Sequence, residues 1–163
     1  MDNQEKKLDG LSIRQVYSAE IFEQCARMMV RSTPWTTLQM TYDQCLTAFQ
    51  GTCKEVFIME RDKEIVGFAI LQMCGSFRGY IQTFFISESF RGQRLSRTLF
   101  EFCESRIRKV SPNIFLCVSA FNVRARDLYK KWGFVEVGVL NNFLKQGFDE
   151  VLMRKSYAPW WTP

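Results

Sequence analysis

The sequence predicts an α/β (α+β) fold, in which strands and helices alternate along the chain. Apolar residues make up 47% of the 163 residues, so a single domain with one sizeable core is expected. Segments with apolar residues at every second position alternate with segments in which they recur at helical spacing. From Tyr80 to Gly133 the pattern predicts strand, turn, helix, strand and helix in that order.

The first half of the chain is expected to hold a strand, two helices and a hairpin. Leu11 to Val16 has the pattern of a strand, and Ser18 can cap the helix that follows it. Pro34 ends this region, and a short second helix begins at Thr41 and is closed by Gly51. The hairpin consists of two strands, Val56 to Glu60 and Ile65 to Met73.

The second half is expected to add four strands and two helices. The strand Tyr80 to Ile86 leads through the basic turn Phe90 to Ser96 into a helix that runs to about Val110. The remaining elements are the strand Ile114 to Val118, the helix Asn122 to Trp132, and the closing strands Phe134 to Val139 and Asp149 to Arg154. Regular alternation puts Tyr80, Gln82, Phe84 and Ile86 on one face of their strand, and Ile81, Thr83 and Phe85 on the other.

The turn Phe90 to Ser96 has features of an anion site. The first N–H groups of the helix that it opens are unpaired, and the helix dipole adds partial positive charge there. Arg91, Arg94 and Arg97 add full charges. The turn has neither the Lys-Ser/Thr of a Walker A loop nor the three glycines of a dinucleotide fingerprint. By itself it is equally compatible with the basic start of a surface helix.

Composition excludes several kinds of chemistry and partner. The chain has no histidine, which rules out Ser-His-Asp triads, Cys-His pairs and His-based zinc sites. Six cysteines occur without a CxxC pair, so free thiols, no metal and a reducing, cytoplasmic location are expected. No apolar run approaches ~20 residues and the N-terminus lacks an apolar signal region, so no membrane association is expected. The net charge of +5 is dispersed, which does not favour nucleic acid.

Two motifs resemble those of the Gcn5-related N-acetyltransferase (GNAT) family. The family's phosphate turn reads Gln/Arg-x-x-Gly-x-Gly/Ala, and Arg91 to Ser96 matches it in part, with Arg94 where the first Gly is usual. The second signature, Asn-x-x-Ala-x-x-x-Tyr-x-x-x-Gly-Phe, is matched by Asn122, Ala125, Tyr129, Gly133 and Phe134. The resemblance implies a mixed, mostly antiparallel sheet of about six to seven strands, flanked by about four helices. It implies one domain over residues 1–163, with an N-terminal extension (1–10) and a C-terminal tail (156–163).

The resemblance also implies a function and a site. The function is transfer of an acetyl group from acetyl-CoA to a primary amine of a small molecule or protein, by direct attack on the thioester. Tyr129 is implied as the acid that protonates the departing thiolate, although its helix face could equally place it in the core. The residues expected to bind the cofactor are Phe84, Phe85, Ile86, Arg91, Gly92, Gln93, Arg94, Leu95, Ser96 and Asn122. Asn122 also suits a helix N-cap.

The general base is not identified by the sequence. Many family members carry a Glu near the position of Gln82, and a glutamine cannot usefully accept a proton. Carboxylates on or beside nearby strands are Glu55, Glu60 and Glu88. With no histidine and no perturbed carboxylate in view, kcat/KM is expected to rise with pH by about one log unit per pH unit until the amine's own pKa is passed.

Two alternative functions stay open at this point. One is a catalytically weak or inactive acyl-CoA-binding module, which Gln82 and Arg94 favour. The other is a nucleic-acid-binding domain, suggested only by net charge. The tail also raises the question of assembly, because Trp160 and Trp161 are adjacent and are expected to pack on the domain itself or on a second copy in a homodimer.

Overall fold

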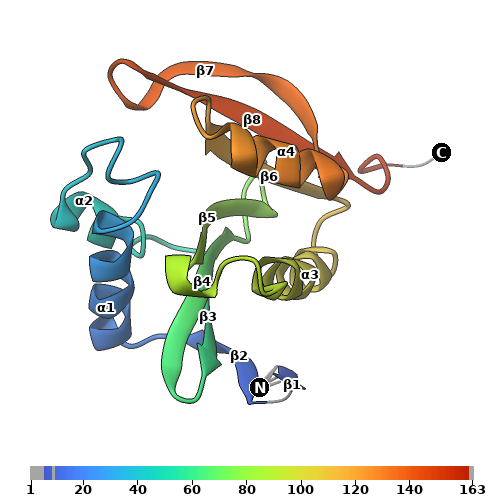
Figure 1. The fold of residues 1–163 in the computed structure, drawn as a ribbon. Coiled ribbons are helices and arrows are strands. Elements are labelled where there is room, and N and C mark those ends of the chain that lie inside the picture. The colour runs from blue at the N-terminus through green and yellow to red at the C-terminus, as the bar shows by residue number, and fades with distance from the viewer. Residues whose placement is uncertain (1–5, 9, 162–163) are drawn as a thin grey trace.

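The computed structural model describes residues 6–8 and 10–161, and all of its strands belong to one sheet (Figure 1). The elements are β1 (Lys6–Leu8), β2 (Leu11–Val16), α1 (Ala19–Val30), α2 (Tyr42–Thr47), β3 (Lys54–Arg61), β4 (Glu64–Gln72), β5 (Tyr80–Ile86), the 3₁₀ helix η1 (Glu88–Phe90), α3 (Leu95–Ile107), β6 (Asn113–Ser119), α4 (Val123–Lys131), β7 (Val135–Lys145) and β8 (Phe148–Ser156). The strand order is β1-β2-β3-β4-β5-β6-β8-β7. Every neighbouring pair is antiparallel except β5 and β6, which are parallel. The predicted mixed, mostly antiparallel sheet is confirmed, with β1 as an added short strand inside the N-terminal extension.

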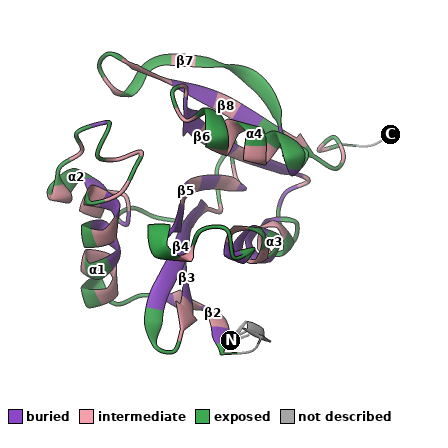
Figure 2. Ribbon diagram, in the orientation of Figure 1, coloured by how far each residue is buried: buried purple, intermediate pink, exposed green. Residues whose placement is uncertain are grey.

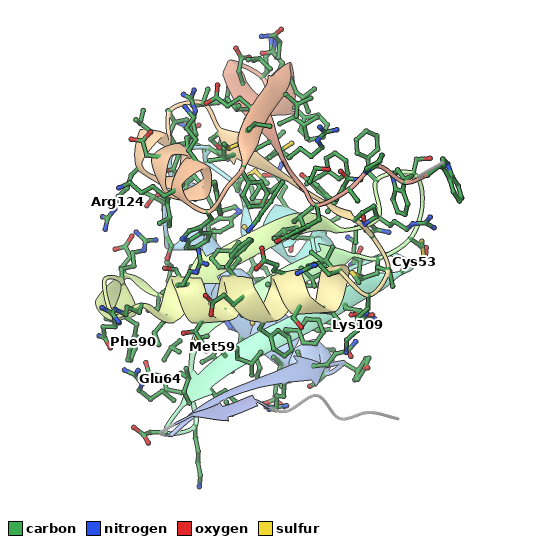
Figure 3. All side chains as sticks on the ribbon, turned by 90° about the vertical axis from the view of Figure 1, so that its right-hand side faces the viewer. Cys53, Met59, Glu64, Phe90, Lys109 and Arg124 are labelled. Atoms are coloured by element: carbon green, nitrogen blue, oxygen red, sulfur yellow. A yellow bond between two sulfur atoms is a disulfide. The ribbon has the colours of Figure 1, made fainter. Side chains whose placement is uncertain are left out.

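Two apolar layers cover the two faces of the sheet. One core contains the inward faces of α3 and α4 with one face of β2 to β6 and β8. The other contains α1, α2 and the opposite face of β3 to β5. Figure 1 shows α1 and α2 on one side of the strands and α3 on the other, and Figure 3 shows α3 lying across the sheet. The central strand β4 is buried along most of its length because helices cover both of its faces (Figure 2). Among the described helices, none is long and apolar enough to cross a bilayer.

A bulge interrupts β5 and changes which residues share a face. Ile70 pairs with Thr83, but Leu71 pairs with Ile81, so Gln82 has no partner on β4. The extra residue shifts the alternation by one position. Ile81 therefore lies in the same core as Phe84 and Ile86, whereas Phe85 lies in the core of α1 and α2. The regular alternation expected for this strand is wrong, because a bulge depends on the partner strand.

β5 and β6 pair over only two positions, Tyr80 with Phe115 and Ile81 with Leu116. The rest of β5, from Gln82 to Ile86, has β4 as its only strand neighbour among the described residues. Backbone groups on the β6 side of this segment therefore have no strand partner. The separation of two adjacent strands in the middle of the sheet creates the space for a site.

The expectation that all six cysteines are free thiols is wrong for two of them. Cys53 and Cys74 form a disulfide with a Cα–Cα distance of 5.7 Å, although 21 residues separate them in sequence. They meet because β3 and β4 are antiparallel, which places the start of β3 beside the end of β4. Figure 3 labels Cys53 at this end of the sheet. Four cysteines remain free: Cys25, Cys45, Cys103 and Cys117.

The two adjacent tryptophans of the tail have different environments. The Trp160 ring lies 4.3 Å from the guanidinium carbon of Arg78, whereas Trp161 is 86% exposed.

We expect Trp160→Ala to lower the free energy of unfolding by about 1 kcal/mol, because it removes a cation–π contact and ring packing. Trp161→Ala is the matched control and should leave thermal melting unchanged. Equal melting temperatures for both variants would show that the Arg78 contact does not stabilise the domain. The last two residues of the tail lie outside the described residues.

Candidate active site

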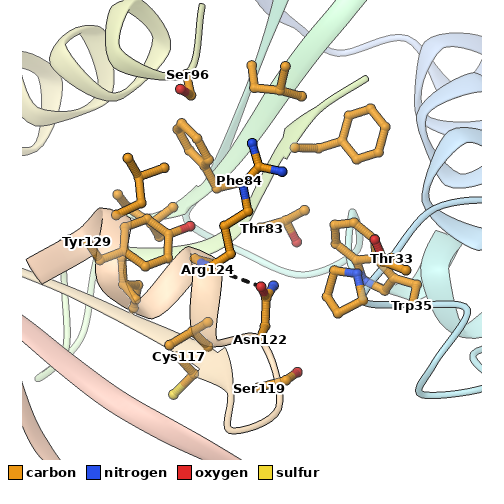
Figure 4. A pocket seen from close by; sticks show the side chains of 18 of the residues that line it. Thr33, Trp35, Thr83, Phe84, Ser96, Cys117, Ser119, Asn122, Arg124 and Tyr129 are labelled. Carbon is orange, nitrogen blue, oxygen red and sulfur yellow. Dashed lines mark hydrogen bonds between the residues drawn. The ribbon is translucent and has the colours of Figure 1, made fainter. Parts of the chain in front are cut away.

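A cavity of about 270 Å³ opens where β5 and β6 separate (Figure 4). Its walls come from the loop between α1 and α2, strands β5 and β6, the turn before α3, the helix α4 and the β7–β8 hairpin. The lining includes Trp35, Gln82 to Ile86, Arg91, Gly92, Ser96, Cys117, Ser119, Asn122, Arg124, Tyr129, Leu144 and Glu150. Segments far apart in the sequence therefore converge on one cavity.

This cavity, called the cleft below, extends to both faces of the sheet. Leu116, Val118 and Val151 belong to the core beneath α3 and α4. Their neighbours on β6 and β8 point to the opposite face, because successive side chains of a strand alternate. These neighbours are Cys117, Ser119 and Glu150. The cleft thus has an α4 side, with Tyr129, and an α1 side, with Trp35; in Figure 4 these two side chains flank the pocket.

The turn before α3 holds the chain in the geometry of an anion site. Gly92 has φ 81° and Arg94 has φ 61°, so both adopt the left-handed conformation. Arg94 precedes the first residue of α3 and makes no side-chain cap, so the first N–H groups of α3 remain available. The family usually has a glycine at the position of Arg94. The left-handed backbone explains this preference, because an arginine adopts that conformation at a higher free-energy cost than a glycine. Arg94 thus departs from the motif in residue type while keeping its backbone geometry.

The turn's side chains divide between the cleft and the protein. Arg91, Gly92 and Ser96 line the cleft, and the Arg91 Nε donates to the Ile86 carbonyl oxygen at 3.3 Å. Gln93, Arg94 and Leu95 do not line it. The Gln93 amide oxygen accepts from Arg61 at 2.7 Å, and Leu95 is buried in the core. These residues are therefore positioned to contribute backbone groups rather than side chains.

Tyr129 combines a packed ring with a free hydroxyl. Its ring centroid lies 5.8 Å from those of both Trp132 and Phe134, in edge-to-face contacts. The residue lines the cleft, and its hydroxyl has no hydrogen-bond partner among the described residues. Burial raises the pKa of Tyr129 above its usual range, so the hydroxyl stays protonated and able to donate at physiological pH. The ring of Tyr129 thus packs in the core while the residue also lines the cleft.

Asn122 also has two aspects. Its Oδ1 accepts from the Ala125 N–H at 3.2 Å, which confirms the N-cap expected from the sequence. The side chain also lines the cleft, beside β6 (Figure 4). Its amide nitrogen has no bond within the described residues and remains available to an acceptor in the cleft.

Comparison with known protein families identifies the chain. The model of the acetyltransferase (GNAT) domain matches residues 17–157, which is most of the sequence. The chain belongs to the GNAT family of N-acetyltransferases. The resemblance inferred from the two sequence motifs is thereby confirmed, and so is the enzyme class.

Individual relatives agree with this assignment. The chain is 27% identical over 110 residues to an N-alpha-acetyltransferase of Sulfurisphaera tokodaii, a match that covers 60% of this chain and 66% of the relative. Ard1 from Thermoplasma volcanium has a similar fold, with a TM-score of 0.75 and 21% identity over 92% of this chain and 99% of that one. A streptothricin acetyltransferase from Bacillus anthracis, solved with acetyl coenzyme A, matches with a TM-score of 0.59 and 18% identity over 67% and 66% of the two chains.

Two charged residues of this GNAT cleft were not singled out from the sequence. Arg124 is one of them, and it lines the cleft from the first turn of α4. A cation there opposes the helix dipole, and that unfavourable placement is a signal that the sequence offered. Glu150 is the second, and it lies on β8 with its carboxylate in the cleft. Its position in the cleft depends on the order of strands in the sheet, which periodicity along one strand does not specify.

The three carboxylates considered from the sequence lie elsewhere. Glu55 pairs with Arg106 at 2.5 Å, Glu60 pairs with Arg14 at 2.8 Å, and Glu88 lies 3.6 Å from Arg91. None of them lines the cleft. The amide of Gln82 donates to the Ala48 carbonyl oxygen at 3.0 Å, so it ties β5 to the end of α2. Within the described chain, no group of three His, Cys, Asp or Glu residues could hold a metal ion.

Proposed function

We propose that this GNAT protein transfers an acetyl group from acetyl-CoA to a primary amine by direct attack of the amine on the thioester. The observation that carries the proposal is the cleft between β5 and β6, which has an anion-binding turn at its α4 side and a separate lining at its α1 side. Two substrates approaching from opposite faces of the sheet meet in this gap. No acyl-enzyme intermediate is required, because both reacting groups fit in one cleft.

The cofactor would bind along the α4 side. The N–H groups from Gln93 to Ser96 suit the pyrophosphate, with Arg91 and Arg124 supplying charge. The pantetheine arm is a chain of amides, and the unpaired edge of β5 from Phe84 to Ile86 offers backbone partners for it. The free amide nitrogen of Asn122 faces the same space. The crystal structure of the Bacillus anthracis acetyltransferase in complex with acetyl coenzyme A supports this choice of cofactor.

The departing sulfur requires stabilisation as the C–S bond breaks. A thiol has a pKa of about 8.5, below that of a buried tyrosine, so complete proton transfer from Tyr129 would be uphill. A hydrogen bond from its hydroxyl to the developing thiolate is favourable throughout and becomes stronger as charge accumulates. We propose Tyr129 as this donor and as the acid for the sulfur, with a proton lost by the attacking nitrogen replacing the one that Tyr129 gives, so that no tyrosinate accumulates.

The acceptor would enter from the α1 side. Trp35 and Leu38 of the α1–α2 loop and Leu144 of the hairpin give this side an apolar rim. A hydrogen bond connects the hairpin to the α1–α2 loop, because Lys145 Nζ donates to the Gln39 carbonyl oxygen at 3.2 Å. The name of the Sulfurisphaera tokodaii relative supports an α-amine at the end of a polypeptide as one acceptor class. A polyamine such as spermidine is the small-molecule alternative.

Release of free CoA thiol tests the proposal. Acetyl-CoA is incubated with the protein and either a short peptide with a free α-amine or spermidine, and the acetylated product is identified by mass spectrometry. Amine-dependent thiol release is expected with at least one of them. Tight binding of acetyl-CoA with no thiol release would instead support an acyl-CoA-binding module.

We propose that residues 1–163 act as one acetyltransferase domain, and that the protein works in the cytoplasm. The Cys53–Cys74 pairing weighs against a reducing compartment, because disulfides are rare there. Alkylation of the thiols in intact cells, followed by mass spectrometry, measures which of the two states is present.

A further inference from the structure

We propose that Glu150 is the carboxylate that binds the acceptor as an ammonium ion and removes its proton before attack. The inference rests on the proposed function and names the general base that Gln82 does not supply. It also defines the acceptor as an amine that enters the cleft carrying positive charge.

Glu150 is the only carboxylate among the residues lining the cleft. It lies on β8 directly opposite Ser119 of β6 and is 2% exposed. Its Oε1 accepts from the Ser119 hydroxyl at 2.6 Å, which fixes the carboxylate's orientation. Its Oε2 has no hydrogen-bond partner among the described residues. This second oxygen is free to accept a hydrogen bond from a donor that enters the cleft.

The carboxylate also lacks a counter-ion. Tyr80 of β5 and Cys117 of β6 lie close to it, and burial raises the pKa of both above their usual ranges. Both groups are therefore neutral at physiological pH. Lys145 follows Leu144 of the cleft lining, and its Nζ donates to the Gln39 carbonyl oxygen. Among the described residues, no cation forms an ion pair with Glu150.

The charged groups of Asp149 and Arg124 do not occupy the space beside the Glu150 carboxylate. The adjacent Asp149 turns to the opposite side of β8, where it accepts from Asn141 and from the Asn142 N–H. Arg124 lines the cleft from α4, which is the side assigned to the cofactor. An ammonium group on the α1 side would therefore meet the negative charge of Glu150, while the Lys145 ammonium on that side is bonded to the Gln39 carbonyl oxygen. This arrangement selects a cationic amine over a neutral or anionic acceptor.

The proton balance of the reaction is complete with these groups. Glu150 takes one proton from the ammonium, and the freed lone pair forms the C–N bond as the C–S bond breaks. The sulfur receives the Tyr129 proton, and the second proton lost by nitrogen restores Tyr129 through solvent. Glu150 returns its own proton to solvent as the products leave. Burial raises the pKa of Glu150, which brings it closer to that of an amine and makes it a better base than an exposed carboxylate.

The raised pKa of Glu150 predicts a stability effect that distinguishes a functional carboxylate from a structural one. A carboxyl whose pKa is higher in the folded than in the unfolded state destabilises the fold when it is ionised. The penalty is absent below the unfolded pKa of about 4.3 and grows as pH rises through the folded pKa. Glu150→Gln should therefore melt at the same or a higher temperature than wild type at pH 7. A side chain held for structure alone would show the reverse.

The experiment compares Glu150→Gln with Asp149→Asn, which makes the same chemical change one residue away on the opposite side of the strand. The acceptors are a peptide with a free α-amine and spermidine. Glu150→Gln is expected to lower kcat/KM about 10²-fold or more, with CoA affinity unchanged, whereas Asp149→Asn keeps wild-type kinetics. With Glu150 as base, the wild-type acid limb should keep one pH midpoint with both acceptors, in place of the limb that follows the amine's pKa expected without a perturbed carboxylate. The rate of Glu150→Gln should instead follow the acceptor's own pKa. Activity of Glu150→Gln within a few-fold of wild type, or a wild-type limb that moves with the acceptor, overturns the assignment.

A binding measurement separates this inference from the function on which it rests. If wild type binds CoA but acetylates neither acceptor, the proposed function fails. Calorimetry of spermidine and of the peptide on the CoA-loaded protein then tests Glu150 alone. Weaker binding of a cationic acceptor to Glu150→Gln than to wild type sustains the amine site. Equal binding to the two proteins, or no binding to either, overturns it.

Discussion

Replacing Tyr129 by phenylalanine is expected to lower kcat about 10²-fold or more. The substitution keeps the ring packed against Trp132 and Phe134 and removes only the hydroxyl in the cleft. CoA affinity and thermal melting should change little, because the hydroxyl has no partner among the described residues. The loss should fall on kcat, since the sulfur acquires negative charge only as the C–S bond breaks.

The control for this variant is Tyr42→Phe, which removes a hydroxyl from a half-buried tyrosine on α2, outside the cleft lining. It should behave as wild type. The raised pKa of Tyr129 adds a second readout, because deprotonation should reduce wild-type kcat only above the ordinary tyrosine value of about 10. A Tyr129→Phe rate within a few-fold of wild type would assign this side chain to the core alone.

Gly92→Asp is expected to weaken CoA binding about tenfold or more. The new carboxylate would stand in the turn proposed to hold the pyrophosphate, and at short range the repulsion outweighs screening by salt. No atom lies within 4 Å of a Cβ added at this position, so space does not oppose the side chain. The positive φ of Gly92 strains any substitution and must be separated from the effect of charge.

Gly92→Asn provides that separation, because asparagine has the shape of aspartate and tolerates the left-handed conformation similarly. The two variants should melt at similar temperatures. Calorimetric titration with CoA should show a much larger loss for Gly92→Asp than for Gly92→Asn. Equal affinities would mean that the phosphates bind elsewhere, and that the turn opens α3 without holding the cofactor.

The elements of the fold could be predicted because their signals are local. Thr41, Asn122 and Gly133 mark helix ends by capping and by positive φ, which depend only on neighbouring residues. The bulge at Gln82 and the disulfide of Cys53 with Cys74 could not be predicted in the same way. Both depend on the register of β4 against a neighbouring strand, which periodicity along one strand does not specify.

The candidate site divides along the same line. The sequence by itself determined the α4 side, because the turn from Arg91 to Ser96 and the helix with Asn122 and Tyr129 are continuous motifs whose spacing fixes their geometry. Only the tertiary structure decided the α1 side, where Glu150 comes from a strand that follows β7 in the chain but lies beside β6 in the sheet. Its burial, its bond to Ser119 and its missing counter-ion are properties of packing between distant segments. They determine the chemistry of a carboxylate that in the sequence looks like any surface glutamate.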